Sequence, residues 1–114
     1  MTYATADMIK FRMRIGDGSR DPEIATAIAY SDAFCDGAIR AAGGAVPVAS
    51  PTQDLKEASA DIGAYYMFRA SNPTVANYFL GSGETILARY IQGAVTVAMA
   101  GAKLTGRSGV RDET

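Results

Sequence analysis

Residues 50–74, SPTQDLKEASADIGAYYMFRASNPT, constrain the fold more than any other stretch of this chain. Ser50 can cap a helix, Pro51 suits the first helical position, and Gln53 completes a capping box. Pro73 disfavours helical geometry in the residue before it, so we expect the helix to end there. Between these signals, apolar and small side chains recur at three- and four-residue steps, at Leu55, Ala58, Ser59, Ile62, and Tyr65 or Tyr66. The stretch therefore predicts the central helix of a small helical core.

The chain has no histidine, and its one cysteine is Cys35. The commonest general base and the commonest zinc ligand are therefore missing, and a disulfide within the chain is impossible. Cys35 lies on the inward face of a predicted helix and has no cation near it in sequence, which favours a buried structural thiol. We expect no enzymatic activity, no catalytic residue, no metal site and no cofactor.

Length and composition predict one ordinary globular domain. The chain has 114 residues, of which 48% are hydrophobic and 20% are charged. Its net charge of −1 gives no general attraction to DNA, and no apolar run approaches the roughly 20 residues of a membrane span. The first ten residues, MTYATADMIK, lack a basic segment followed by an apolar one, so we expect no signal peptide.

A short first helix is expected over residues 5–14, capped by Thr5. Its apolar residues surround the cylinder and do not form one stripe, which favours a helix that docks on the core. The alternative is that part of this face, including Tyr3 and Phe11, meets another subunit.

The remaining helices follow from capping and breaking signals, so the sequence predicts an all-α fold, a small bundle of about four helices. The second helix opens at Asp21-Pro22 and stops at Gly43-Gly44. Residues 74–92 are helical in pattern, but Gly81-Ser82-Gly83 interrupts them and predicts two pieces or a kink. We expect Gly93 to end this last helical part.

The sequence thus divides into a helical domain, residues 1–93, and an extended C-terminal arm, residues 94–114. Val95 and Val97 alternate as in a short strand, but no second strand is predicted for them to pair with. The arm is either a frayed terminus or a segment that becomes ordered only against a partner, for example by strand addition. Its later part carries three basic residues, Lys103, Arg107 and Arg111.

Three carboxylates form a candidate site, because paired carboxylates can perform acid–base chemistry or hold a divalent metal. Asp32 and Asp36 are four residues apart on one helix face, and Asp61 on the next helix can join them. Helix surfaces carry such pairs routinely, so we interpret them as structural. For Asp61 we expect a helix-to-helix contact, for example with an arginine of a neighbour.

Several short motifs together resemble the Mu-like phage head–tail connector proteins, also called neck or adaptor proteins. The central signature is Asp61-Ile62-x-x-Tyr65-x-x-Phe68-Arg69, followed by Asn72-Pro73-Thr74. The opening Tyr3-x-Thr5-x-x-Asp7-Met8-Ile9, the linker Val46-Pro47-Val48 and the ending Ile91-x-Gly93-x-Val95 are also similar, in the same order. The chain departs from the family at Gly81-Ser82-Gly83, which interrupts a helix that is typically continuous, and after Met13, where the segment is shorter.

The resemblance implies a non-enzymatic helical subunit that forms a ring beneath the portal of a tailed phage or phage-like particle. The ring, twelve-fold to match the portal, would extend the channel through which double-stranded DNA passes without sequence-specific binding. Its partners would be the portal protein, the next neck or tail component and further copies of itself, with no membrane. The subunit would be made in the host cytoplasm and end in the neck of the virion.

We expect the first helix, the central aromatics and the arm to make the contacts with other subunits, and the arm to grip the portal. The residues that we assign to these contacts are Tyr3, Phe11, Asp61, Tyr65, Phe68, Arg69, Val95, Val97, Lys103, Arg107 and Arg111. Two further readings stay open: a tail-completion protein of the same kind of particle, and a small helical regulatory binding module.

Overall fold

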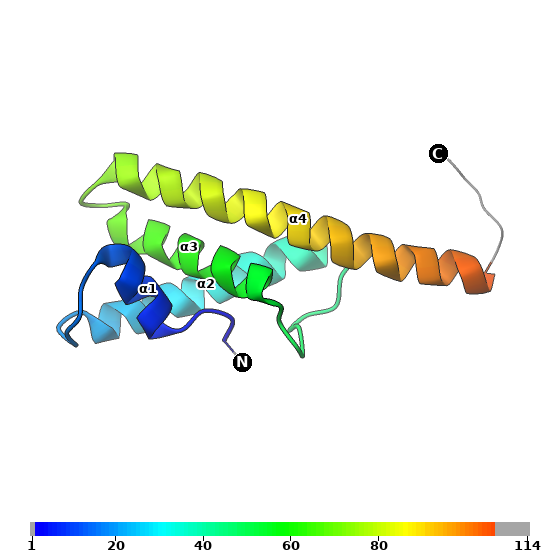
Figure 1. The fold of residues 1–114 in the computed structure, drawn as a ribbon, viewed down its shortest axis with the longest axis horizontal. Coiled ribbons are helices and arrows are strands. Elements are labelled where there is room, and N and C mark those ends of the chain that lie inside the picture. The colour runs from blue at the N-terminus through cyan, green and yellow to red at the C-terminus, as the bar shows by residue number, and fades with distance from the viewer. Residues whose placement is uncertain (1, 107–114) are drawn as a thin grey trace.

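The computed structural model describes the backbone of residues 2–106 and the side chains of residues 2–94. Four helices follow one another in the chain and no strand occurs in this part: α1 (Ala6–Met13), α2 (Asp21–Ala41), α3 (Gln53–Phe68) and α4 (Pro73–Gly106) (Figure 1). The predicted all-α bundle of about four helices is confirmed.

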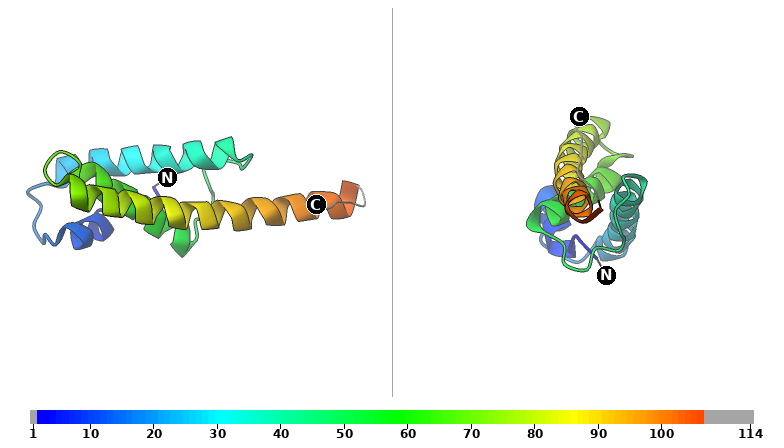
Figure 2. Two further views of the ribbon diagram at one scale, coloured as in Figure 1. Left: turned by 90° about the horizontal axis from the view of Figure 1, so that it is seen from above. Right: turned by 90° about the vertical axis from the view of Figure 1, so that its right-hand side faces the viewer.

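Helix α3 is the centre of the bundle. Both α4 and α2 pack along it, and the short α1 packs against α3 and also touches α2 (Figure 2). The residues of α3 that are buried are mostly small: Leu55, Ala58, Ser59, Ala60, Asp61, Ile62, Gly63, Ala64 and Met67. Small side chains let helix axes approach closely, which is how one helix can contact three neighbours.

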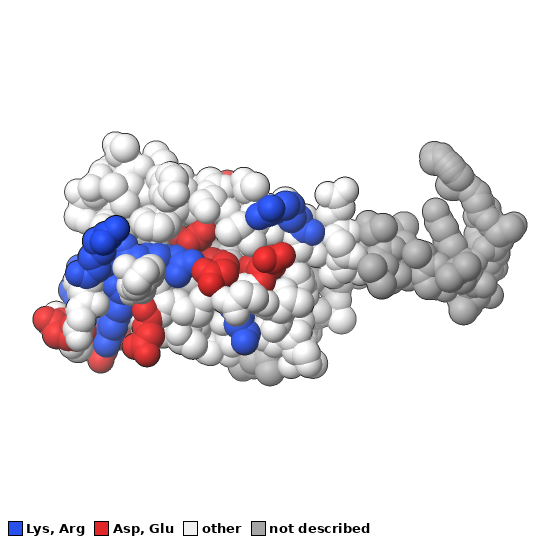
Figure 3. Space-filling view, in the orientation of Figure 1, with Lys and Arg blue, Asp and Glu red and all other residues white. Residues whose placement is uncertain are grey.

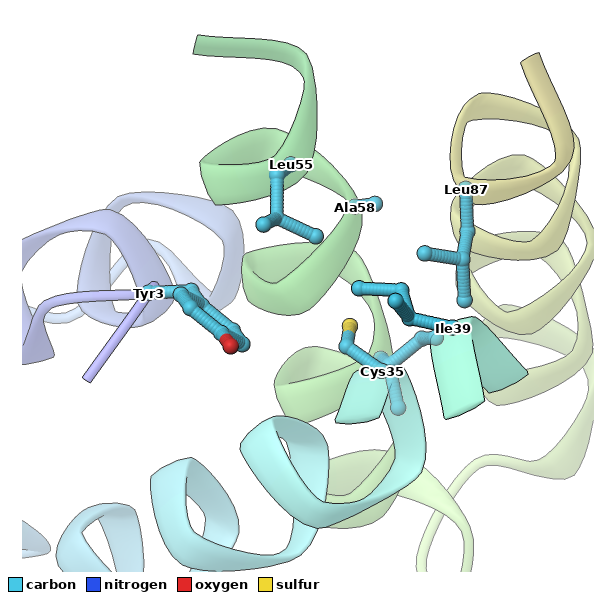
Figure 4. Packing of buried hydrophobic residues seen from close by; sticks show 7 residues of the cluster. Tyr3, Cys35, Ile39, Leu55, Ala58 and Leu87 are labelled. Atoms are coloured by element: carbon cyan, nitrogen blue, oxygen red, sulfur yellow. The ribbon is translucent and has the colours of Figure 1, made fainter. Parts of the chain in front are cut away.

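Two hydrophobic clusters fill the space around α3. One cluster extends from the N-terminal segment to α4 and contains Tyr3, Cys35 and Ile39 of α2, Leu55 and Ala58 of α3, and Leu87 of α4 (Figure 4). The other joins α1 to the far end of the bundle through Ile9, Ile24, Ala27 and Met67. The predicted central role of the stretch around α3 is confirmed, and Cys35 is fully buried as expected.

The ends of α3 differ from the sequence prediction. Thr52 caps the helix by accepting a hydrogen bond from the Leu55 amide, whereas Ser50 was expected to be the cap. The helix stops at Phe68, and Pro73 is the first residue of α4, with the Asn72 side chain accepting from the Val75 amide. Proline suits the first helical position as well as it ends the preceding helix, and here both effects act within one short turn.

Gly81-Ser82-Gly83 does not break α4, contrary to the prediction. A Cβ built on Gly83 would lie 2.8 Å from Ile62 Cγ1, 3.1 Å from the Ala58 carbonyl oxygen and 3.1 Å from Asp61 Cβ. The glycine is therefore needed where α4 crosses α3 at short range, and packing against α3 outweighs its low helix propensity.

Helix α4 also continues past Gly93, where the sequence predicted its end, to Gly106. The backbone at Val95 and Val97 is therefore helical, and the strand interpretation of these residues is corrected. Alanine, the best helix former, recurs through this part of the sequence, and neither Gly93 nor Gly101 is followed by proline. Residues 107–114 lie outside the described part. None of the described helices is both long enough and apolar enough to cross a membrane.

The two glycines near the middle of α4 give a matched test of this packing. Gly83→Ala should lower the free energy of unfolding by about 1–3 kcal/mol, because its methyl group overlaps α3. Gly81→Ala, where a Cβ would meet nothing within 4 Å, should raise it by about 0.5–1 kcal/mol through helix propensity. Urea denaturation followed by circular dichroism measures both, and equal stabilities for the two variants would contradict the close crossing.

Candidate functional site

An ion-pair network centred on Arg12 joins α1, α3 and α4. The Arg12 Nε donates to Asp61 Oδ1 at 2.6 Å, and its Nη2 donates to the Glu57 carboxylate. The other oxygen of Asp61 accepts from the hydroxyl of Ser82 at 2.8 Å. The side chains of Arg12 and Asp61 are only 15% and 8% exposed, so this pair lies in the interior. The hydrogen bond from Arg12 lowers the pKa of Glu57 below its ordinary value.

A second polar network ties the N-terminal segment to α2 and to the linker before α3. The hydroxyl of Tyr3 donates to Asp36 Oδ1 at 2.5 Å and accepts from the Val48 amide at 2.9 Å. Asp32 Oδ1 accepts from the Tyr3 amide and from the hydroxyl of Ser59, each at 3.1 Å. Burial raises the pKa of Asp32, and burial followed by the hydrogen bond to Asp36 raises the pKa of Tyr3 to about 12.

The carboxylates of both networks are engaged within the bundle. Asp61, Asp32 and Asp36 accept hydrogen bonds from the chain's own side chains or backbone, and burial raises the pKa of the Cys35 thiol to about 12. No group of three or more possible metal-ligating side chains occurs in the described part of the chain. The hydrogen bonds of these carboxylates hold the N-terminal segment and the helices together.

The surface beside the Arg12 network carries four aromatic rings, which we call the aromatic face: Phe11 of α1, Phe68 of α3, and Tyr78 and Phe79 of α4. Phe11 is 82% exposed and Tyr78 is 70% exposed. The rings of Phe68 and Phe79 stack at 5.9 Å between centroids. Together with Met13, Val75 and nearby side chains they line a groove of about 580 Å³.

The same side of the molecule is uncharged above this groove. No charged residue occurs from Pro73 to Gly83, and the space-filling view shows a white area over the start of α4, above a band of charged side chains (Figure 3). Large aromatic rings left in water without charged neighbours on one side are typical of an interaction surface. The aromatic face is therefore the candidate functional site.

A separate aromatic cluster lies between α2 and α3. The ring of Tyr30 packs against Phe34, Tyr65 and Tyr66, with the Tyr66 centroid 5.0 Å away. The guanidinium of Arg69 lies over Tyr66, 4.3 Å from the ring centroid. The same guanidinium lies 5.6 Å from the ring centroid of Tyr30, so Arg69 connects the end of α3 to α2 while it remains exposed.

The structure separates the predicted contact residues into three groups. Tyr3 and Asp61 are 2% and 5% exposed, so the expectation that their side chains face another subunit is corrected; they hold the chain's own helices together. Phe11 and Arg69 are exposed, and Tyr65 and Phe68 are half-buried at the surface. The side chains of three residues in α4 and the whole of two beyond it lie outside the described part: Val95, Val97, Lys103, Arg107 and Arg111.

Sequence reasoning missed Tyr78, Phe79 and Arg12. Tyr78 and Phe79 are neighbours on a helix and point about 100° apart, so at most one of them can lie at the centre of the core-facing stripe. For Arg12 the sequence offered no sign, because its partners are 45 and 49 residues away.

Comparison with known proteins gives no relative. No protein-family profile, no curated protein and no solved structure matches this chain.

Removing the Arg12 side chain should destabilise the fold strongly. Arg12→Met leaves Asp61 buried without its cation, and a buried pair broken in this way costs about 3–5 kcal/mol. The control is Arg20→Met: Arg20 also pairs with a carboxylate, Glu23, but both side chains are exposed, so the loss should stay below about 1 kcal/mol. Chemical denaturation compares them, and adding Asp61→Asn to Arg12→Met should recover part of the loss. Equal losses in the two single variants would refute the buried network.

The raised pKa of Tyr3 predicts that the free energy of unfolding changes at high pH. Its pKa is raised from 10.0 to about 12 in the fold, so the unfolded chain loses this proton first as the pH rises. The stabilising contribution is complete below pH 10 and is lost between pH 10 and about 12. Tyr3→Phe should be less stable near neutral pH, because the Val48 amide and Asp36 lose their partner, but its stability should fall less over this alkaline range. Parallel pH profiles of the two proteins would contradict the assignment.

Proposed function

We propose that the chain is a structural head–tail connector subunit of a tailed phage or phage-like particle. It forms a ring under the portal, and this ring is twelve-fold to match the portal. The ring extends the DNA channel and joins head to tail. The subunit acts by assembly and has no enzymatic activity. Its partners are the portal protein, the next neck or tail component and further copies of itself, and its place is the neck of the virion.

The observation that carries this proposal is the aromatic face. Phe11 and Tyr78 are largely exposed in a chain whose buried carboxylates are already engaged in its own packing. Exposed rings of this kind provide a surface on which a partner can dock. The sequence motifs that resemble the connector proteins agree with this, because the signature residues around Asp61 and Phe68 lie under and beside that face.

The shape of α4 supports the same proposal. Its described side chains contact the core as far as Ile91, and its backbone continues helically to Gly106, about 20 Å further at 1.5 Å per residue. The helix thereby extends beyond the end of α2 and α3 (Figure 1). A projecting helix that begins in a bundle and ends outside it suits a subunit that must reach a second ring. The net charge of −1 suits a channel that DNA passes without binding tightly.

The test is assembly with the portal protein of the same particle. Full-length protein and a version that ends at Gly93 are each analysed, alone and with the portal, by size-exclusion chromatography with light scattering and by electron microscopy. We expect the full-length protein to form rings, alone or on the portal. The shortened version should remain folded but should no longer bind the portal.

Two outcomes would redirect the proposal. A folded full-length monomer that does not bind the portal but binds a tail component would indicate a tail-completion protein. A folded monomer that binds neither would remove the connector proposal and favour a regulatory binding module.

A further inference from the structure

The turn between α3 and α4 carries three hydrogen-bond donors that have no acceptor in the described part of the chain. They are the guanidinium of Arg69, the backbone amide of Ala70 and the hydroxyl of Ser71. All three residues are exposed, and all three line one pocket of about 410 Å³, which we call the turn pocket. Donors that line one pocket together suit an oxygen anion, because a deprotonated oxygen acid only accepts hydrogen bonds.

The guanidinium of Arg69 is positioned before any ligand arrives. It lies 4.3 Å from the ring centroid of Tyr66 and 5.6 Å from that of Tyr30. Attraction to the face of a ring uses none of the N–H groups as donors, so they stay available for a second partner. An arginine side chain normally loses conformational entropy when it binds an anion, and the two rings reduce this loss. Arg69 is therefore a preorganised cation, and none of the ion pairs among the described residues includes it.

The other charges of the turn pocket favour a carboxylate over a phosphate. Arg20 and Glu23 also line the pocket and neutralise each other, because Arg20 Nε donates to Glu23 Oε1 at 2.6 Å. Two arginines and one glutamate leave a net charge of +1, which Arg69 supplies. A singly charged carboxylate matches this charge, and its two oxygens match the fork of the guanidinium. A phosphate ester carries about −1.5 to −2 charge at pH 7 and would be repelled by Glu23.

The turn pocket lies at the end of the bundle where α2 begins and α3 ends, opposite the far end of α4 (Figure 1). Most of its lining residues are exposed, so the pocket is shallow. A small free carboxylate would gain few contacts there. A carboxylate carried by a protein would also bring its neighbouring atoms onto Tyr66 and Met67, which line the same pocket. The pocket therefore suits an acidic side chain of a protein partner.

We propose that the turn pocket binds the carboxylate of an aspartate or glutamate side chain on a protein partner. The carboxylate pairs with the guanidinium of Arg69 and accepts hydrogen bonds from the Ala70 amide and the Ser71 hydroxyl. This inference goes beyond the connector proposal and does not depend on it, because it follows from contacts within one chain. In a connector, the pocket would provide a contact at the opposite end of the subunit from the far end of α4.

The test is an NMR titration of the full-length protein at constant ionic strength. The probe is the blocked peptide acetyl-Ala-Glu-Ala-amide, whose single carboxylate is the glutamate side chain, and the control is the same peptide with glutamine. We expect the glutamate peptide to cause saturable shifts of the Arg69 Nε–H resonance and of the Ala70 and Ser71 amide resonances, and the glutamine peptide to cause none. Inorganic phosphate should bind about fivefold more weakly because of Glu23, and acetate about fivefold more weakly because it lacks the flanking contacts.

Variants locate the binding in the turn pocket. Arg69→Gln should weaken it about tenfold, and Arg69→Lys about threefold, since lysine keeps the charge but lacks the guanidinium fork. The matched control is Arg40→Gln, which should leave the affinity unchanged. Arg40 is also exposed and has no ion pair among the described residues, but it lies in the last turn of α2, outside the pocket. Ser71→Ala changes an exposed residue outside the helices, should weaken binding about threefold, and decides the matter if an Arg69 variant does not fold.

Several results would overturn the inference. Equal shifts with both peptides would show that the carboxylate is not recognised, and equal weakening in Arg69→Gln and Arg40→Gln would show a general attraction to positive charge. Phosphate or acetate that binds as tightly as the glutamate peptide would assign the pocket to a small anion. None of these measurements involves the portal. A pocket that binds no carboxylate leaves the connector proposal standing, and a failure to form rings leaves the pocket standing.

Discussion

The close approach of other helices to α3 is the constraint on which the rest of the structure depends. At Gly83 of α4, and at Gly63 of α3 where a Cβ would lie 2.6 Å from Ile9 Cδ1, a side chain has no room. Much of the core around α3 is accordingly made of small residues such as Ala58, Ala60 and Ser59, with larger side chains such as Tyr3 and Leu55 toward one end.

The buried polar groups fix which helix faces meet. Arg12 reaches Asp61 and Glu57 only if α1 lies at one position along α3, and Ser82 reaches Asp61 only if α4 does. Tyr3 has the same effect on the linker through the Val48 amide. Apolar packing of small residues alone would allow neighbouring registers of similar energy, so these hydrogen bonds select one arrangement of the helices.

The fold was largely predictable from local signals, and the site was not. Apolar spacing and capping residues located the helices, since both act within a few residues of each other. Gly83 was misjudged because a glycine that breaks a helix and a glycine that admits a neighbour look alike until the neighbour is known. Asp61 was correctly expected to meet an arginine, but the sequence could not say that the arginine was the chain's own Arg12. The sequence offered an exposed Phe11 as one of two alternatives. The other residues of the aromatic face could be identified only once the packing of the bundle was known.

The length of α4 gives the subunit the mechanics of a lever. The helix approaches α3 closely at Gly83, and from there to Gly106 it runs about 35 Å at 1.5 Å per residue. A tilt of only about 10° around that crossing would carry its far end sideways by about 6 Å, roughly the pitch of one helical turn. Small adjustments between helices in the bundle would therefore appear at the tip as displacements as large as a side chain.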